Sequence, residues 1–273
     1  MKQFDMTRFG RVMKLDFAEG RKAMMWGALC MLLLYLFFFW FAHMIGFHSS
    51  AFDYINNPEE ALRKRMNAIC ESVGVFAAMA MYIFFLITAS TLYRGEQKKQ
   101  LRIAWLMLPA TNLEKFLSRW LYMLSFSIVG GILMFFVADL IHTAYLWKTG
   151  NPVMSATDDF FLLWPHVDKF RTLTHAITGW SILVSIHSFF LLSGVFFKKF
   201  HFIAASAIFV LLFTTIVAMM NAIGYRDTPS TASTFDARII LNCMLVCLTA
   251  LFTWLSYRLF CRWQVVTHKF ANV

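Results

Sequence analysis

The chain has 273 residues, a length that suits one or two soluble domains, but its composition points elsewhere. Hydrophobic residues make up 59% of the chain and charged residues only 15%, against about 25% charged residues in soluble domains. The abundance of Phe and Met over Pro and Gly favours long helices and excludes a disordered, collagen-like or disulfide-stapled secreted chain. The net charge of +10 is not gathered in a basic soluble domain, so we expect no nucleic-acid partner. These features predict an all-α, polytopic integral membrane protein.

The first 22 residues predict an amphipathic helix at the membrane surface. Asp5 fits the N-cap position, and Phe9, Met13 and Phe17 then recur at helical spacing between Arg and Lys residues. Such a helix lies in the interface, with its Phe side toward the membrane lipids and its cations toward the headgroups. The alternative interpretation is a basic leader that only sets the topology of the chain.

Six later stretches are apolar enough, over about 20 residues each, to cross about 30 Å of hydrocarbon. They cover residues 23–47, 70–93, 120–147, 173–197, 202–224 and 239–261, with approximate ends. We expect them to form a single transmembrane domain over residues 1–273. The first stretch is too long for a signal-peptide core, so we expect it to remain in the mature protein.

The distribution of Lys and Arg predicts the orientation. With both termini inside, the inner segments hold 17 of the 25 basic residues and five of the 15 acidic residues. The outer segments hold the other eight basic residues and nine acidic residues. Because cytoplasmic segments retain positive charge, both termini are predicted to be cytoplasmic. The inner cations would face anionic lipids and acidic partner surfaces.

The inner loop over residues 94–119 carries the most specific pattern. Pro109 disfavours helix at the residue before it, and Thr111-Asn-Leu-Glu114 matches a capping box at a helix start. We therefore predict a short helix over about 112–119 at the membrane surface, with Glu114, Lys115 and Arg119 on its polar side. The alternative is that these residues only begin the third span. A 26-residue loop far exceeds what two antiparallel helices need, which favours a contact with another protein.

Polar residues inside the spans are costly and need a role. Asp139 and His142 share one face of the third span, and His43 and His175 also lie near outer span ends. These four residues could form a metal site, but no tight metal-binding motif supports one. We expect Asp139 to pair with a His or Arg of a neighbouring helix or to line an aqueous vestibule. The five cysteines show no metal-binding or disulfide pattern, so we predict no metal and no cofactor.

Several catalytic motifs are missing from the sequence. The chain has no G-x-x-x-x-G-K-[ST] nucleotide-binding loop, no H-E-x-x-H and no G-x-S-x-G. We therefore expect a protein that is not an enzyme by any of these routes.

The stretch Leu106-Met-Leu-Pro-Ala-Thr-Asn-Leu-Glu-Lys-Phe-Leu-Ser-Arg-Trp120 resembles the LPAS-x-x-EKF-x-x-R segment of ABC-2 type permease proteins from Bacteroidota. The closing segment, residues 256–264, is similar to their C-terminal end. One departure is Thr111, where Ser is commoner, and Thr preserves the cap. The surface helix, the six spans and the loop helix between spans two and three also resemble the membrane subunit of these transporters.

The resemblance implies a permease subunit, and an exporter, in the bacterial inner membrane. Residues 112–119 would be the coupling helix seated on a separately encoded ABC ATPase, and the N-terminal helix would be the connecting helix. Glu114, Lys115 and Arg119 would contact that ATPase, while Pro109 and Thr111 would set the helix start. A homodimer or a heterodimer of permeases would form the pathway.

Two other functions stay open at this point. The first is a membrane scaffold or sensor of the same fold that works without an ATPase. The second is an intramembrane metal-dependent enzyme that uses Asp139, His142 and a neighbouring His.

Overall fold

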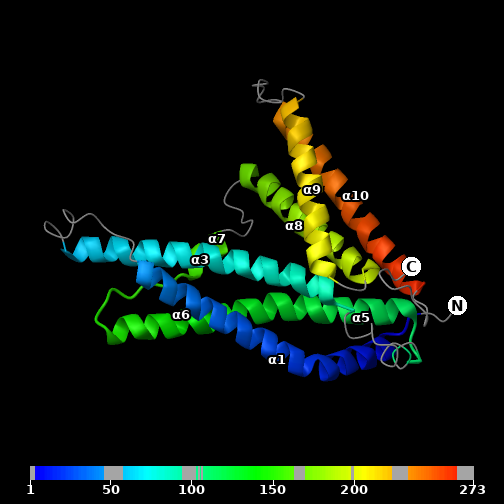
Figure 1. Cartoon of the computed structure of the whole chain (residues 1–273), viewed down its shortest axis with the longest axis horizontal. Helices are drawn as coiled ribbons and strands as arrows, with labels where there is room; N and C mark the ends of the chain where they lie inside the picture. Colours follow the sequence, from blue (N-terminus) through cyan, green and yellow to red (C-terminus); the bar gives the residue numbers. More distant parts are fainter. Residues whose placement is uncertain are drawn as a thin grey trace. The chain divides into compact units, whose positions relative to one another are not determined.

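The structure, a computed structural model, describes residues 4–45, 58–93, 103, 105, 107–162, 170–197, 200–222 and 233–262. The regular structure within these residues consists of helices and includes no β-strand (Figure 1). The all-α prediction is therefore confirmed for the described part of the chain. The ends of two predicted spans and most of the first half of the inner loop, residues 46–47, 223–224 and 94–102, lie outside it.

Three long helical stretches form the first half of the chain. Helix α1 (Met6–Ile45) has 40 residues and α3 (Pro58–Thr91) has 34. The third stretch joins α5 (Asn112–Ser125), a π-helical turn η2 (Phe126–Gly130) and α6 (Gly131–Lys148), 37 residues in all. At a rise of about 1.5 Å per residue, this last stretch is about 55 Å long, well beyond the hydrocarbon thickness.

These lengths correct two predicted boundaries. The N-terminal helix and the first span are one continuous helix, and the predicted short helix at 112–119 is the first two turns of the long third helix. No proline interrupts either junction, so the helix continues from the polar segment into the apolar one. Residues 112–119 therefore begin the third long helix, and the apolar stretch of that helix starts at Trp120.

The second half of the chain contains α7 (Thr157–Leu162), α8 (Phe170–Phe196), α9 (His201–Ala222) and α10 (Ser233–Cys261). Five helical segments among the described residues are long and apolar enough to cross a membrane. They lie within α1, α3, α5–α6, α8 and α10, and α9 contributes a shorter apolar segment, His201–Leu212. The membrane character of the chain is thus supported, while the count of six spans stays a prediction.

The chain divides into two compact units. One contains residues 1–16, 86–123 and 167–273, and the other contains residues 17–85 and 124–166. The three long helical stretches pass from one unit into the other. Nothing in this division tests the predicted single transmembrane domain, which stays a prediction.

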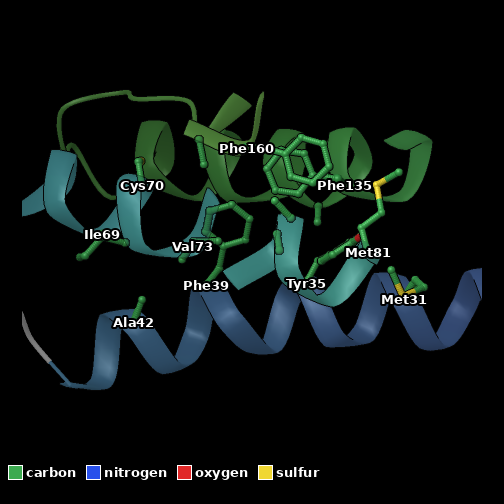
Figure 2. Close-up of a cluster of buried hydrophobic side chains, with 14 of the residues drawn as sticks. Met31, Tyr35, Phe39, Ala42, Ile69, Cys70, Val73, Met81, Phe135 and Phe160 are labelled. Atoms are coloured by element: carbon green, nitrogen blue, oxygen red, sulfur yellow. The ribbon is translucent and has the colours of Figure 1, made fainter. Parts of the chain in front are cut away.

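The core of the unit with residues 17–85 and 124–166 is built from α1, α3, α6 and α7 (Figure 2). Its α1 stripe consists of Met31, Tyr35, Phe39 and Ala42, which recur every three or four residues as one helix face requires. The rings of Phe135 and Phe160 stack with their centroids 4.1 Å apart.

A close helix approach supports this core. A Cβ at Gly74 of α3 would lie 2.6 Å from the Cβ of Asp159 and 2.7 Å from the backbone nitrogen of Phe160. Only glycine therefore lets α7 approach α3 at this point.

The other unit is held together by α8, which packs against α9 and α10. The Ser185 hydroxyl of α8 donates to the carbonyl of Leu245 at 3.0 Å and lies 2.9 Å from the hydroxyl of Thr249. A second cluster of buried side chains joins the end of α3, the inner loop, α5, α8 and α10. Its members are Leu92, Tyr93, Trp105, Phe116, Leu191, Val195 and Phe260.

Candidate functional site

The starts of α1 and α5 are both closed by the predicted caps. The Asp5 carboxylate accepts hydrogen bonds from the backbone N–H groups of Thr7 at 2.8 Å and Arg8 at 3.4 Å. At the start of α5, the Glu114 carboxylate accepts from the N–H of Thr111 at 2.8 Å, and the Thr111 hydroxyl accepts from the N–H of Glu114 at 3.3 Å. Each reciprocal bond satisfies a donor that a helix start leaves open. Both capping predictions are confirmed.

Glu114 also joins the two helix starts to one another. Its carboxylate accepts two hydrogen bonds from the Arg8 guanidinium, at 2.7 and 2.6 Å, and one from the backbone N–H of Asp5 at 2.8 Å. One buried carboxylate therefore serves the N-termini of α1 and α5, where the helix dipoles favour negative charge. We call Asp5, Arg8, Thr111 and Glu114 the double cap.

The double cap changes the acidity of Glu114, which lies ahead of the apolar stretch that starts at Trp120. The hydrogen bonds from Arg8 are the largest cause, and those from the N–H groups of Asp5 and Thr111 add to them. Together they lower the pKa of Glu114 from 4.5 to about 2, against the opposing effect of burial. Glu114 is therefore a carboxylate at every physiological pH.

A second ion pair of reversed polarity connects the same two segments. Asp16 of α1 lies 3.0 Å from the Nε of Arg119 in α5, and it accepts a hydrogen bond from the Ser118 hydroxyl. The acid is therefore on α5 in the first pair and on α1 in the second. A shift of α1 along α5 would bring like charges closer, so the two pairs favour a single register.

The cations of α5 also contact an aromatic ring of the inner loop. The Nζ of Lys115 lies 5.7 Å and the guanidinium carbon of Arg119 lies 5.5 Å from the ring centre of Trp105, within cation–π range. The Trp105 ring meets Phe260 of α10 edge to face, with centroids 5.3 Å apart. The start of α5 is thus linked to the N-terminal segment on one side and to the last helix on another.

The predicted partner-contact residues lie in different environments. Glu114, Lys115 and Arg119 are 0%, 2% and 9% exposed, so their charges face other parts of this chain and not its surface. Thr111 is half-buried and Pro109 is exposed. Their direct contact with a partner stays a prediction, and their burial assigns them contacts within this chain.

The exposed side chains at the same place include two large apolar ones. Met107 is 78% exposed and Leu113 is 40% exposed. The partners of the buried charges were not predictable from local spacing, because Arg8 and Glu114 are 106 residues apart in the sequence.

The predicted apolar stripe of the N-terminal helix is only partly covered. Phe9 and Met13 are half-buried and Phe17 is exposed, while Val12 and Asp16 of the same segment are buried. The face that packs on this chain is therefore the one with Val12 and Asp16. The contact of the Phe9, Met13 and Phe17 side with lipid stays a prediction.

Asp139 is held by partners other than the predicted ones. Its carboxylate accepts from the Ser155 hydroxyl at 2.6 Å, the Ala156 N–H at 3.0 Å and the Thr157 hydroxyl at 3.0 Å. Two of these donors lie just before α7 and Thr157 is its first residue, so the buried Asp139 fixes the start of α7 to α6. Among the described residues, the hydrogen-bond donors to this carboxylate are thus two hydroxyls and a backbone N–H, in place of the His or Arg that we expected.

His142 pairs with a histidine. Its Nε2 lies 3.1 Å from the Nε2 of His43 in α1, and its ring stacks on Phe39 with centroids 4.1 Å apart. One imidazole must donate while the other accepts. The side chain of His175 lies outside the described residues, and the described residues contain no group of three or more metal-binding side chains. The structure thus brings together two of the four residues of the conceivable metal site.

Comparisons with protein-family models, with curated proteins and with solved structures find no match to this chain.

Proposed function

We propose that this chain is the membrane-spanning permease subunit of an ABC-2 type transporter, an exporter driven by a separately encoded ABC ATPase. The observation that carries the proposal is the double cap, which fastens the N-terminal segment to the start of the third long helix. A displacement of the start of α5 would move α1 as well, through the contacts of Glu114 and Asp16. Both helices continue into apolar stretches that are long enough to cross a membrane.

The contact surface for the ATPase is the exposed side of the first turn of α5 and of the loop before it. The buried charged side chains hold this surface in its conformation. Leu113 and Met107 are exposed there, while Glu114 and Arg119 are engaged with α1. In this proposal Glu114, Lys115 and Arg119 are positioning residues. Removing these side chains would weaken the attachment of α1 to α5. It would not remove a side chain that touches the ATPase.

The remaining parts of the proposal follow from the topology and the resemblance. Both termini would be cytoplasmic, the protein would lie in the bacterial inner membrane with six spans, and two permease subunits would form the pathway. ATP-driven closure of the ATPase dimer would push on the start of α5 and re-orient the spans. The exposed apolar side chains of α10 and α1 suit contact with lipid or with a second subunit.

Co-purification of the full chain from native membranes in mild detergent, with mass spectrometry of bound proteins, tests the proposal. We expect an ABC ATPase with the wild type and at least a tenfold lower yield with Leu113→Glu. Val153→Glu is the matched control, because Val153 is also exposed but lies in the other unit, after α6. Absence of any ABC ATPase with the wild type would favour the scaffold or sensor function instead.

A further inference from the structure

Two histidines from different helices meet in the unit with residues 17–85 and 124–166. His43 lies in the last turn of α1, and His142 lies on α6. Their Nε2 atoms are 3.1 Å apart and their ring centres are 5.3 Å apart, so each nitrogen points toward the other ring. This arrangement holds one hydrogen between the rings, with one imidazole as donor and the other as acceptor.

The geometry of the pair fits a shared hydrogen better than a shared metal ion. A metal ion bound by both nitrogens at about 2.0–2.1 Å would lie off the line that joins them, whereas the rings direct their nitrogens along that line. The ring of His142 is also fixed in its orientation, because it stacks on Phe39 of the α1 stripe (Figure 2) with centroids 4.1 Å apart. The ligand that this site fits is therefore the proton.

The surroundings of His142 indicate which ring donates. Among the described residues, its Nδ1 is buried and has no hydrogen-bond partner. Buried N–H donors without an acceptor are rarer than buried acceptors without a donor, so this nitrogen is bare in the neutral pair. His142 then donates from its Nε2, and the half-buried His43 accepts. The bare Nδ1 of His142 remains as the position for one more proton.

Two charged groups act on the pair from opposite sides. The carboxylate of Asp139 acts on His142, and the guanidinium of Arg65 in α3 acts on His43. An added proton is therefore more favourable on His142, near the negative charge, than on His43. A second proton would place two positive rings in contact, and like charges at this distance disfavour one another strongly. The ring of Tyr145, which meets His43 edge to face, adds no charge.

We propose that His43 and His142 form a proton-binding site that takes up one proton from the medium, and only one. The proton forms an N–H bond with the Nδ1 of His142, and no other bond breaks. The hydrogen bond from the Nε2 of His142 to His43 becomes charge-assisted and therefore stronger. Proton binding thus tightens the contact between α1 and α6. This inference stands on the histidine pair and does not depend on the proposed function.

Potentiometric titration of the purified full chain in detergent counts the protons that the pair binds. The chains are wild type, His142→Gln and the double variant His43→Gln/His142→Gln, and uptake is counted relative to the double variant. The range from about pH 8 to about pH 4.5 spans the ordinary titration of histidine. We expect one proton for wild type and one for His142→Gln, because a single ring can take the charge that the pair shares.

Two other results would overturn the proposal. Two protons for wild type would show two independent histidines. No proton for wild type would show a hydrogen bond that only holds the helices together. The comparison with His142→Gln identifies the sharing, because two independent rings would lose one proton in this variant.

Nitrogen-15 NMR of the wild-type chain, labelled at histidine, needs no variant and keeps the test decisive if the double variant fails to fold. At about pH 8 the pair should show one protonated and one bare Nε2, coupled through their hydrogen bond. At about pH 4.5 the Nδ1 of His142 should be protonated while the Nε2 of His43 stays bare. A bare Nδ1 on His142 at this pH, or two protonated Nε2 atoms, would contradict the proposal.

Discussion

Replacing Glu114 by alanine should release the N-terminal segment from α5. The change removes the acceptor of four hydrogen bonds, two of them from the backbone N–H groups of Asp5 and Thr111. Each lost cap costs about 1 kcal/mol, and the charge-assisted contact adds a smaller amount because water can solvate the partly exposed Arg8. A local cost of about 2 to 3 kcal/mol corresponds to roughly 30- to 160-fold more frequent opening.

Hydrogen exchange measured by mass spectrometry reports this opening directly. The amides of residues 9–16, which donate within α1, should exchange roughly 30- to 160-fold faster in the Glu114→Ala chain, while those of α10 stay unchanged. Lys14→Ala, at an exposed position of the same segment, is the control and should exchange like the wild type. An acceleration below about threefold, or an equal one in α10, would show that Glu114 does not hold the two helix starts together.

Three further predictions follow from other contacts. Gly194→Ala should lower the thermal unfolding midpoint in detergent, because the new Cβ would lie 2.5 Å from the carbonyl oxygen of Ser90. The control Gly10→Ala, whose Cβ would have no atom within 4 Å, should keep or raise the midpoint. Equal midpoints for the two variants would contradict the close packing of α8 and α3. Asp139→Ala should increase proteolysis of the segment before α7 at least fivefold, because it removes the acceptor of three hydrogen bonds. An unchanged cleavage rate would show that these hydrogen bonds do not hold the segment in place. Exchange of residues 9–16, normalised to the intrinsic rate, should be constant from pH 7 to 5 and rise as the pH falls from about 4.5 toward 2. The reason is that the lowered pKa of Glu114 makes its contribution to stability present above pH 4.5 and lost on protonation. A chain with Glu114→Gln should show a clearly smaller rise, and an equal rise would contradict this assignment.

Helix starts could be predicted from the sequence because their signals are local. Asp5 and the Thr111–Glu114 box contain both partners of each capping bond within four residues, and the structure has both caps. The long apolar stretches were predictable for the same reason, because hydropathy is a property of consecutive residues.

Helix ends and side-chain partners were less predictable. The polar residues 112–119 differ in character from the span that follows, yet nothing in the backbone chemistry breaks the helix between them. The contact of Arg8 with Glu114 and that of Asp16 with Arg119 join residues more than 100 positions apart, and no spacing rule connects them. The same holds for Asp139, whose donors lie 16 to 18 positions later, just before α7 and at its first residue.

Site-specific photo-cross-linking in native membranes tests whether an ABC ATPase contacts the start of α5. A photoreactive amino acid at position 113, on the exposed side of the first turn of α5, should form an adduct with an ABC ATPase. The same amino acid at position 153, after α6, should form none. We predict that ATP with vanadate changes the yield at position 113 at least threefold, because closure of the ATPase moves the contact. An ATPase adduct absent from position 113, or equal at both positions, would contradict it.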